Sequence, residues 1–424
     1  AKDVQSEAVT LLKNDDSNLP LSGKKVNVFG WGSTNPVYGG TGSGSMSKQY
    51  KTVSLLDGMK QAGLKTNTEL SKLYTDYRKD RPEVGMFAQD WTLPEVPAKQ
   101  YSDKLVSDAK DFSDEAVVVL TRVGGEGADL PTDMKAKGIT YKNNSKDYDD
   151  FQKGESFLQL SKTERDMIDL VTSNFKKVTL VYNGANTFQF DFLNDYPQIQ
   201  SVVWCPPAGQ TGFSALGEAN PSGKTSDTFL KDLTKSVSYN NFGKFEYTNM
   251  ADKAAKYKGF TGDDVTAIPG FVNYSEGIYV GYKFYETASD EGLINYDDTV
   301  AFPFGYGLSY TSFDQKLDSV KYKGGKVTVT ATVTNTGDKA GKDVVEVYYN
   351  PPYTDGGIEK ASKNLAGFEK TKELQPGESQ KVTVKFDDDD MASYDYKGAK
   401  AYMLEKGDYD TSIQSDSPHV IDHK

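Results

Sequence analysis

The sequence predicts an α/β domain with a mostly parallel sheet, followed by a small all-β sandwich. Short apolar runs at 26–29, 116–120 and 178–182 alternate with stretches of helical periodicity. Strands and helices that alternate in this way form a parallel sheet covered on both faces. After Ser309 the apolar period changes to two, most clearly over Val327–Val333, which indicates an antiparallel sandwich with one buried face per sheet.

We expect the α/β domain to span residues 1–235. Helical spacing of Val4, Ala8, Leu11 and Leu12 predicts an amphipathic helix at the start, ended by a turn at 14–16. The strand at 26–29 leads into a glycine-rich loop. The next helix is predicted around 53–59 and ends at Gly63.

The second half of the α/β domain repeats the pattern. A long polar loop over about 128–157 follows the strand at 116–120. Ser161 and Glu164 have the spacing of a capping box, which predicts the start of another helix. Strands at 178–182 and 202–204 complete the expected sheet.

Residues 236–308 are expected to form a connector, and residues 309–421 the β-sandwich. The connector is rich in Tyr, Gly and Asn, with one helix predicted from Glu276 to Glu286. A turn at Asn335–Asp338 and further alternating runs suit a sandwich of roughly 100 residues.

Composition excludes several classes of partner and cofactor. The formal net charge is −12, so no excess of Lys and Arg exists to neutralise nucleic-acid phosphates. No apolar stretch approaches the length of about 20 residues that spans a membrane. Cys205 is the single cysteine, and His419 and His423 lie in the polar tail, so we expect no disulfide, no metal site and no cofactor. The first residues are not a signal peptide, but the chain can begin inside a longer polypeptide, so this says little about the compartment. We leave the location open and favour the cytoplasm.

Two glycine-containing motifs resemble nucleotide-binding loops and fail on spacing. In the loop that starts at Gly30, the third glycine of a dinucleotide fingerprint would fall at Asn35. Before the motif Asn220–Thr225, five residues separate Gly217 from Gly223, where a P-loop has four between its glycines. The first loop is therefore either a flexible surface connection or a backbone that approaches a ligand closely.

The loop after the strand at 116–120 carries a candidate catalytic carboxyl group. Glu126 is flanked by Gly124, Gly125 and Gly127, at the sheet edge where ligands of open parallel sheets bind. Arg122 or Asp129 could shift its pKa, in opposite directions. The residues alone leave open that Glu126 is simply an exposed loop glutamate.

Seven stretches of the chain point to one family. They are Glu7–Asn14, Gly39–Gly44, Arg122–Gly127, Asn220–Lys224, Tyr274–Tyr282, Phe302–Tyr310 and Leu365–Glu378. In this order they resemble family 3 glycoside hydrolases of the β-glucosidase type, in the portion outside their (β/α)8 barrel. The resemblance implies an α/β sandwich that opens with a helix at Glu7–Asn14, followed by a fibronectin-III-like domain.

The resemblance also implies an activity and its residues. The chain would be part of a retaining, exo-acting hydrolase that removes terminal β-linked sugars, with Glu126 as general acid/base. Ser43 would contact a sugar hydroxyl, and Arg122 would help to bind substrate or support the site. The nucleophile would be an aspartate on the absent barrel, so the isolated chain is expected to be inactive.

The expected partners are a β-glycoside or oligosaccharide substrate and a (β/α)8 barrel domain from the same polypeptide or another chain. The fibronectin-like domain could also mediate a homodimer. The resemblance does not fix whether the barrel precedes or follows this chain. Two alternatives remain: a non-catalytic carbohydrate-binding or scaffold protein of the same fold, and a nucleotide-dependent α/β enzyme.

Overall fold

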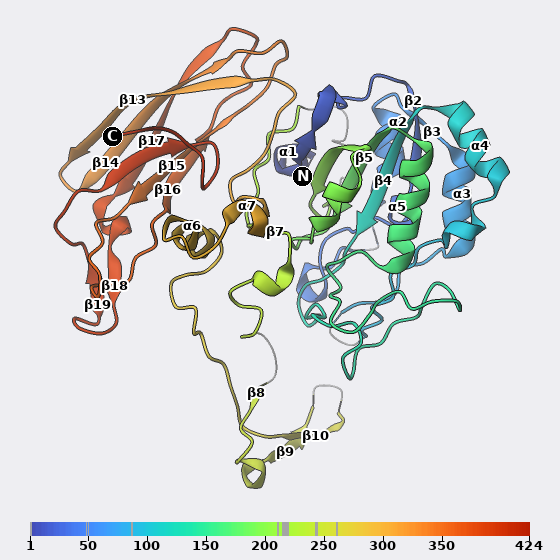
Figure 1. Ribbon diagram of the computed structural model, residues 1–424, viewed down its shortest axis with the longest axis horizontal. Helices are drawn as coiled ribbons and strands as arrows, with labels where there is room; N and C mark the ends of the chain where they lie inside the picture. The colour runs from blue at the N-terminus through green and yellow to red at the C-terminus, as the bar shows by residue number, and fades with distance from the viewer. Residues whose placement is uncertain are drawn as a thin grey trace.

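The computed structural model describes residues 2–47, 49, 51–85, 88–209, 212–213, 220–241, 245–259 and 262–424. An α/β body and an all-β body lie side by side, and a thin arm projects below them (Figure 1). The fold class predicted from the sequence is confirmed.

The α/β body is built on a six-stranded sheet with the order β1-β6-β5-β4-β2-β3. Its strands are β1 (Thr10–Asn14), β2 (Lys25–Phe29), β3 (Lys65–Thr66), β4 (Glu115–Thr121), β5 (Lys177–Asn183) and β6 (Ile199–Cys205). All neighbours run parallel except β1, which pairs antiparallel with β6 at the edge. Every residue of β4 is buried, as expected of a central strand covered on both faces.

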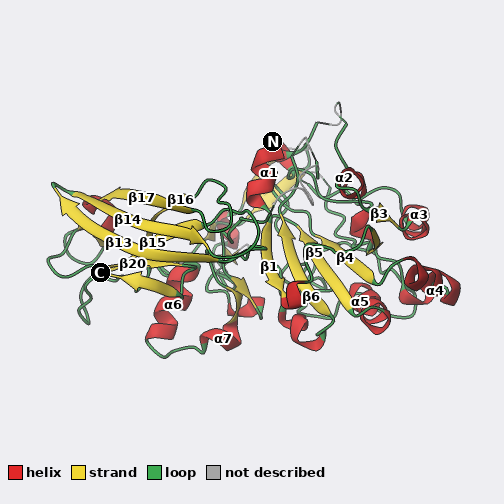
Figure 2. Ribbon diagram, turned by 90° about the horizontal axis from the view of Figure 1, so that it is seen from above, coloured by secondary structure: helices red, strands yellow, loops and turns green. Residues whose placement is uncertain are grey.

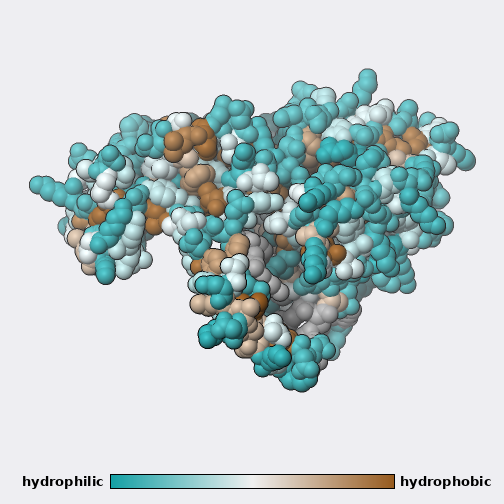
Figure 3. Space-filling view, turned by 60° about the horizontal axis from the view of Figure 1, so that its bottom comes forward, coloured by the Kyte–Doolittle hydropathy of each residue, from teal (hydrophilic) through white to brown (hydrophobic). Residues whose placement is uncertain are grey.

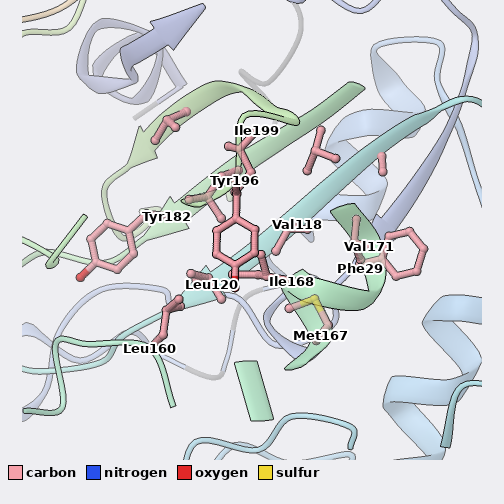
Figure 4. Packing of buried hydrophobic residues seen from close by; sticks show 14 of the residues in the cluster. Phe29, Val118, Leu120, Leu160, Met167, Ile168, Val171, Tyr182, Tyr196 and Ile199 are labelled. Carbon is pink, nitrogen blue, oxygen red and sulfur yellow. The ribbon is translucent and has the colours of Figure 1, made fainter. Parts of the chain in front are cut away.

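Helices cover the two faces of this sheet (Figure 2). They are α2 (Leu55–Gln61), α3 (Thr68–Tyr77), α4 (Asp103–Phe112) and α5 (Lys162–Asn174). Val118 and Leu120 of β4 pack with α3, α4 and α5, whereas Val117 and Val119 pack with α2. Figure 4 shows Val118 and Leu120 beside Met167 and Ile168 of α5. The predicted capping box of Ser161 and Glu164 is present at the start of α5.

The opening of the chain differs from the prediction. Helix α1 (Lys2–Ala8) ends at Ala8, and Leu11 and Leu12 lie in β1. Leu11 joins the core on one face of the sheet and Leu12 the core on the other. Successive side chains of a strand point to opposite faces, so a short apolar run was wrongly read as one face of a helix.

Among the described residues, three short two-stranded sheets include strands of the connector. They pair β7 (Phe229–Leu230) with β12 (Val300–Phe302), β8 (Phe245–Glu246) with β11 (Gly270–Phe271), and β9 (Ala255–Lys258) with β10 (Asp264–Ala267). Phe229 and Phe302 belong to the core of the α/β body, so the connector leaves that body and returns to it. The domain boundaries at 235 and 308 stay predictions.

The connector helix starts later than predicted. It is α6 (Tyr282–Asp290), followed by α7 (Tyr296–Thr299). Gly277 and Gly281 have φ of 59° and 58°, and this left-handed backbone cannot continue a helix. The residues from Glu276 to Gly281 therefore form turns, and the helix begins after the second glycine.

The second body is an antiparallel β-sandwich, as predicted. One sheet holds β13 (Phe313–Lys323), β14 (Lys326–Asn335) and β17 (Ser379–Asp387), and the other holds β16 (Asn364–Lys370), β15 (Val344–Asn350), β20 (Asp410–Gln414) and β21 (Val420–His423). A hairpin of β18 (Ser393–Asp395) and β19 (Ala401–Met403) projects from it. Alternate residues of β14, such as Val327 and Val329, fill the core between the sheets.

Candidate active site

Glu126 lies on a tight loop at the carboxyl end of β4. Gly125 and Gly127 both have positive φ, 151° and 71°, and the amide of Ala128 donates to the carbonyl of Gly125 at 3.0 Å. The loop therefore turns sharply, and it leaves the side chain of Glu126 exposed. A carboxyl group in this position can reach a molecule outside the sheet edge.

The glycine-rich loop that follows β2 holds the Glu126 carboxylate. The amide and the hydroxyl of Ser43 both donate to Oε2 of Glu126, at 2.7 and 2.5 Å. The hydroxyl of Thr41 donates to the backbone carbonyl of Glu126 at 2.9 Å. The two loops are thus joined through both the side chain and the backbone of Glu126.

Two glycines are required by this close approach. A Cβ on Gly42 would lie 2.5 Å from Oε2 of Glu126, and a Cβ on Gly125 would lie 2.7 Å from the hydroxyl oxygen of Thr41. Gly42 also has a φ of 60°, which side chains other than glycine rarely tolerate. The glycine-rich loop is therefore a tight turn against the Glu126 loop, and not a loose surface connection.

The hydrogen bonds fix the charge state of the site in this chain. The hydroxyl and then the amide of Ser43 lower the pKa of the Glu126 carboxyl below its ordinary value, because both donate to the ionised form. At neutral pH the group is therefore a carboxylate, ready to accept a proton. To donate one, it needs a neighbour that disfavours its charge, such as a second carboxylate.

Arg122, predicted to help to bind substrate or to support the site, lies buried inside the α/β body, and its role stays a prediction. Its guanidinium is completely buried, between the rings of Phe157 and Phe188. All five of its N–H groups are used: they donate to both carboxylate oxygens of Glu164 at 2.7 Å and to the carbonyls of Thr121, Phe157 and Gln159. Arg122 therefore joins the end of β4 to the start of α5 and fixes the root of the Glu126 loop.

Two supporting residues were not identified from the sequence. Thr41 holds the backbone of Glu126 as described, and the side-chain amide of Gln89 donates to the carbonyl of Gly127 at 2.8 Å. Both residues lie far from Glu126 in the sequence. Thr41 belongs to the glycine-rich stretch Gly39–Gly44 but was not singled out within it, and Gln89 stands in no recognisable motif. Only the folded arrangement shows that they clamp the loop from two sides.

A groove of about 680 Å³ lies beside the same loop. One wall contains Asp129, Leu130 and Thr132, which follow Glu126 directly, and the other contains Val272 and Tyr274 of the connector. The hydroxyl of Tyr239 donates to the carbonyl of Thr132 at 3.3 Å. The connector and the Glu126 loop are therefore neighbours in space.

The motif that resembles a P-loop joins the two bodies. The side-chain oxygen of Asn220 accepts from the hydroxyl of Ser309 and the amide of Tyr310, and Lys224 donates to the carbonyl of Gly307 at 2.9 Å. A Cβ on Gly223 would lie 2.6 Å from the carbonyl oxygen of Val9. The residues of this motif thus pack against the start of the chain and against residues 307–310.

Among the described residues, no group of three or more His, Cys, Asp and Glu side chains is placed to hold a metal ion. His419 pairs with Asp416 and His423 with Asp410, both within the β-sandwich. Within the same described ranges, no helix has the length and hydropathy needed to cross a bilayer.

Comparison with known proteins identifies the class of this arrangement. Residues 9–282 match the model of the glycosyl hydrolase family 3 C-terminal domain, and residues 343–417 match the fibronectin type III-like domain. The chain is 33% identical to β-glucosidase A of Butyrivibrio fibrisolvens over 95% of its length, and 33% identical to a β-glucosidase of Ruminococcus albus over 98%. A β-glucosidase structure from Paenibacillus barengoltzii superposes on all of it with a TM-score of 0.80 at 31% identity.

The α/β domain thus corresponds to the C-terminal domain of family 3 glycosyl hydrolases, and the sandwich to the fibronectin type III-like domain. The chain belongs to glycoside hydrolase family 3. It spans 48% and 39% of the two relatives and 42% of the superposed structure, so less than half of each lies within the matched region.

Proposed function

We propose that this chain supplies the general acid/base, Glu126, to a retaining β-glucosidase whose nucleophile lies on a (β/α)8 barrel domain. The observation that carries the proposal is the placement of the Glu126 carboxylate. It is exposed at the carboxyl edge of the sheet and oriented by two hydrogen bonds from Ser43. Two of its relatives are β-glucosidases, which supports the substrate class.

In this mechanism the barrel carboxylate attacks the anomeric carbon while Glu126 protonates the departing oxygen. Retaining enzymes hold the two carboxyl groups about 5 Å apart. At that distance the ionised nucleophile raises the pKa of Glu126, which opposes the effect of Ser43. Once the nucleophile is esterified its charge is lost, the pKa of Glu126 falls, and its carboxylate activates the water that releases the sugar.

The low pKa of Glu126 in this chain alone agrees with a divided site. The hydrogen bonds from Ser43 stabilise the base form, and the charge that would stabilise the acid form has to come from the second domain. We therefore expect the purified chain to be inactive on aryl β-glucosides. Measurable hydrolysis by this chain alone would contradict the divided site.

The test substitutes Glu126→Gln in the full-length enzyme. For aryl β-glucosides with poor leaving groups, the rate should fall by about 10²–10⁴-fold, because proton transfer to the departing oxygen is lost. For strongly activated leaving groups the first step should be affected far less. Glu373→Gln, at an exposed position of the β-sandwich, is the control.

The main alternative is a carbohydrate-binding or scaffold protein that retains the fold without chemistry. It predicts that Glu126→Gln alters sugar binding at most and leaves turnover unchanged for all leaving groups. The leaving-group dependence therefore separates the two functions.

A further inference from the structure

The arm, residues 245–281 of the connector, has no core of its own. Its strands form two two-stranded sheets, β8 with β11 and β9 with β10, and they project away from both bodies (Figure 1). None of its described residues belongs to a buried hydrophobic cluster of the described chain. Two-stranded sheets of this kind are marginal in water unless another surface packs against them.

The arm also exposes a concentration of large apolar side chains. Those with more than a third of their surface accessible are Tyr247, Tyr257, Phe271, Val272, Tyr274, Ile278 and Val280. Tyr274 is 77% exposed and Val272 60%, and Figure 3 shows apolar side chains among polar ones on this face. Apolar surface gathered in this way marks an interaction site.

The groove where the arm meets the α/β body favours a partner with positive charge. Its described lining contains three carboxylates, those of Asp129, Asp227 and Glu276, and neither Lys nor Arg. A surface that fills it must therefore bring cations or hydrogen-bond donors, because buried charges need partners. One wall of the groove begins three residues after Glu126, so a partner seated there also borders the candidate site.

We propose that the arm and this groove form the docking surface for the (β/α)8 domain, which presents Lys or Arg side chains to the three carboxylates. The inference rests on the proposed function. The relatives carry more than half of their length outside the matched region, and that portion must meet the Glu126 edge if it brings the nucleophile. A second copy of this chain, with a net charge of −12, would add negative charge to an acidic groove.

Amide hydrogen exchange, measured on the isolated chain and on the full-length enzyme, tests the docking surface. Docking should slow exchange in β10, β11 and residues 272–281 by at least about tenfold in the full-length enzyme, because surface amides become covered. The hairpin of β18 and β19 is the internal reference. It carries Tyr402, which is 74% exposed, and its exchange should be equal in both proteins.

A matched pair of variants links the surface to docking. In the full-length enzyme, the double variant Tyr274→Ser and Val272→Ser should remove most of the protection of the arm from amide exchange. It should also lower kcat/KM by about tenfold, because weaker docking displaces the Glu126 carboxylate relative to the substrate. Tyr402→Ser should change neither quantity. All three side chains are exposed, so the changes leave the cores intact.

Two results would overturn the proposal. One is equal exchange of the arm in the isolated chain and the full-length enzyme. The other is a dimer of the isolated chain in sedimentation that the arm variant abolishes, which would assign the surface to a second copy. If Glu126→Gln slows turnover as expected while amide exchange in the arm is equal in both proteins, only the docking surface is wrong. If the full-length enzyme cleaves no β-glucoside, the proposed function is wrong, and amide exchange in the arm can still be compared.

Discussion

At the scale of the residue, the contact between Ser43 and Glu126 sets the ionisation of the candidate acid/base. One oxygen of the carboxylate accepts two hydrogen bonds from Ser43, and these lower its pKa. The sequence suggested both residues through family resemblance, with Ser43 as a contact for sugar. It gave no indication that Ser43 would contact Glu126, because 83 positions separate them.

Ser43→Ala should raise the pKa of Glu126 toward its ordinary value in the isolated chain. The hydroxyl donor is lost and the amide donor remains, so the shift should be partial. Titration of the side-chain carboxyl carbon by NMR measures it, with Glu126→Gln used to assign the signal. Ser45→Ala, in the same loop, is the control, and an unchanged pKa in Ser43→Ala would contradict the role of the hydroxyl.

Arg122 shows where residue-level prediction from the sequence is limited. The resemblance implied that it binds substrate or supports the site, and gave no sign that its guanidinium is buried against Glu164 at 2.7 Å. A loop arginine carries no local sign of burial, because the carboxylate that receives it lies on α5, 42 residues further on. The capping box that predicted α5 also placed Glu164 at the helix start, and that was the available clue.

Arg122→Met should lower the free energy of unfolding by about 3–5 kcal/mol, because it leaves the carboxylate of Glu164 buried without its partner. Adding Glu164→Gln should restore part of the loss. Urea denaturation of the isolated chain measures both effects. If Arg122 instead contacted substrate, its replacement would raise KM in the full-length enzyme and leave stability unchanged.

At the scale of the element, the apolar runs predicted as strands of the α/β sheet were correct, whereas the assignment of Leu11 and Leu12 to a helix was not. The runs at 116–120 and 178–182 became the central strands β4 and β5, because β-branched and other apolar residues suit a strand that is buried on both faces. Leu11 and Leu12 were assigned to a helix and lie in the edge strand β1. Leu11 and Leu12 face opposite cores, a distinction that depends on packing and that four residues cannot reveal.

The connector was the least predictable element for a related reason. Its structure depends on backbone conformation at glycines, such as Gly281 before α6, and on contacts with segments far away in the sequence. Periodicity placed a helix near the right position and missed its start by six residues (Glu276 predicted, Tyr282 observed). Nothing in the local sequence distinguished a projecting arm from an ordinary loop.

At the scale of the whole molecule, a buried carboxylate lies where the β-sandwich packs against the end of the connector. Glu346 of β15 is 4% exposed and accepts a hydrogen bond from the hydroxyl of Tyr348 at 2.8 Å. The backbone of Gly305 leaves no room for a side chain, since a Cβ there would lie 2.2 Å from the carboxylate. Burial raises the pKa of Glu346 to about 8.

This raised pKa predicts how stability depends on pH. Because the folded pKa lies above the unfolded value of 4.5, the protonated form is favoured in the folded state. The contribution of protonated Glu346 to the free energy of unfolding is fully present below about pH 4.5 and is lost as the pH rises through about 8. Thermal unfolding between pH 5 and 9 should therefore show falling stability toward the alkaline end.

Glu346→Gln should flatten part of this decline, so that the variant is the more stable protein above pH 8 and similar to the natural chain near pH 5. Its amide oxygen still accepts from Tyr348. Glu95 and Glu286, whose pKa values are also raised by burial, should leave some pH dependence in place. A variant that tracks the natural chain at every pH would show that Glu346 stays ionised in the fold.

The central claim is that Glu126 donates the proton to the departing sugar oxygen across the boundary between two domains. The most direct measurement is the pH dependence of kcat/KM for the full-length enzyme on a β-glucoside with a poor leaving group. We predict a fall on the alkaline side as Glu126 loses its proton, and no such fall in Glu126→Gln. An alkaline limb that survives in Glu126→Gln, with similar rates near neutral pH, would assign the acid to another residue.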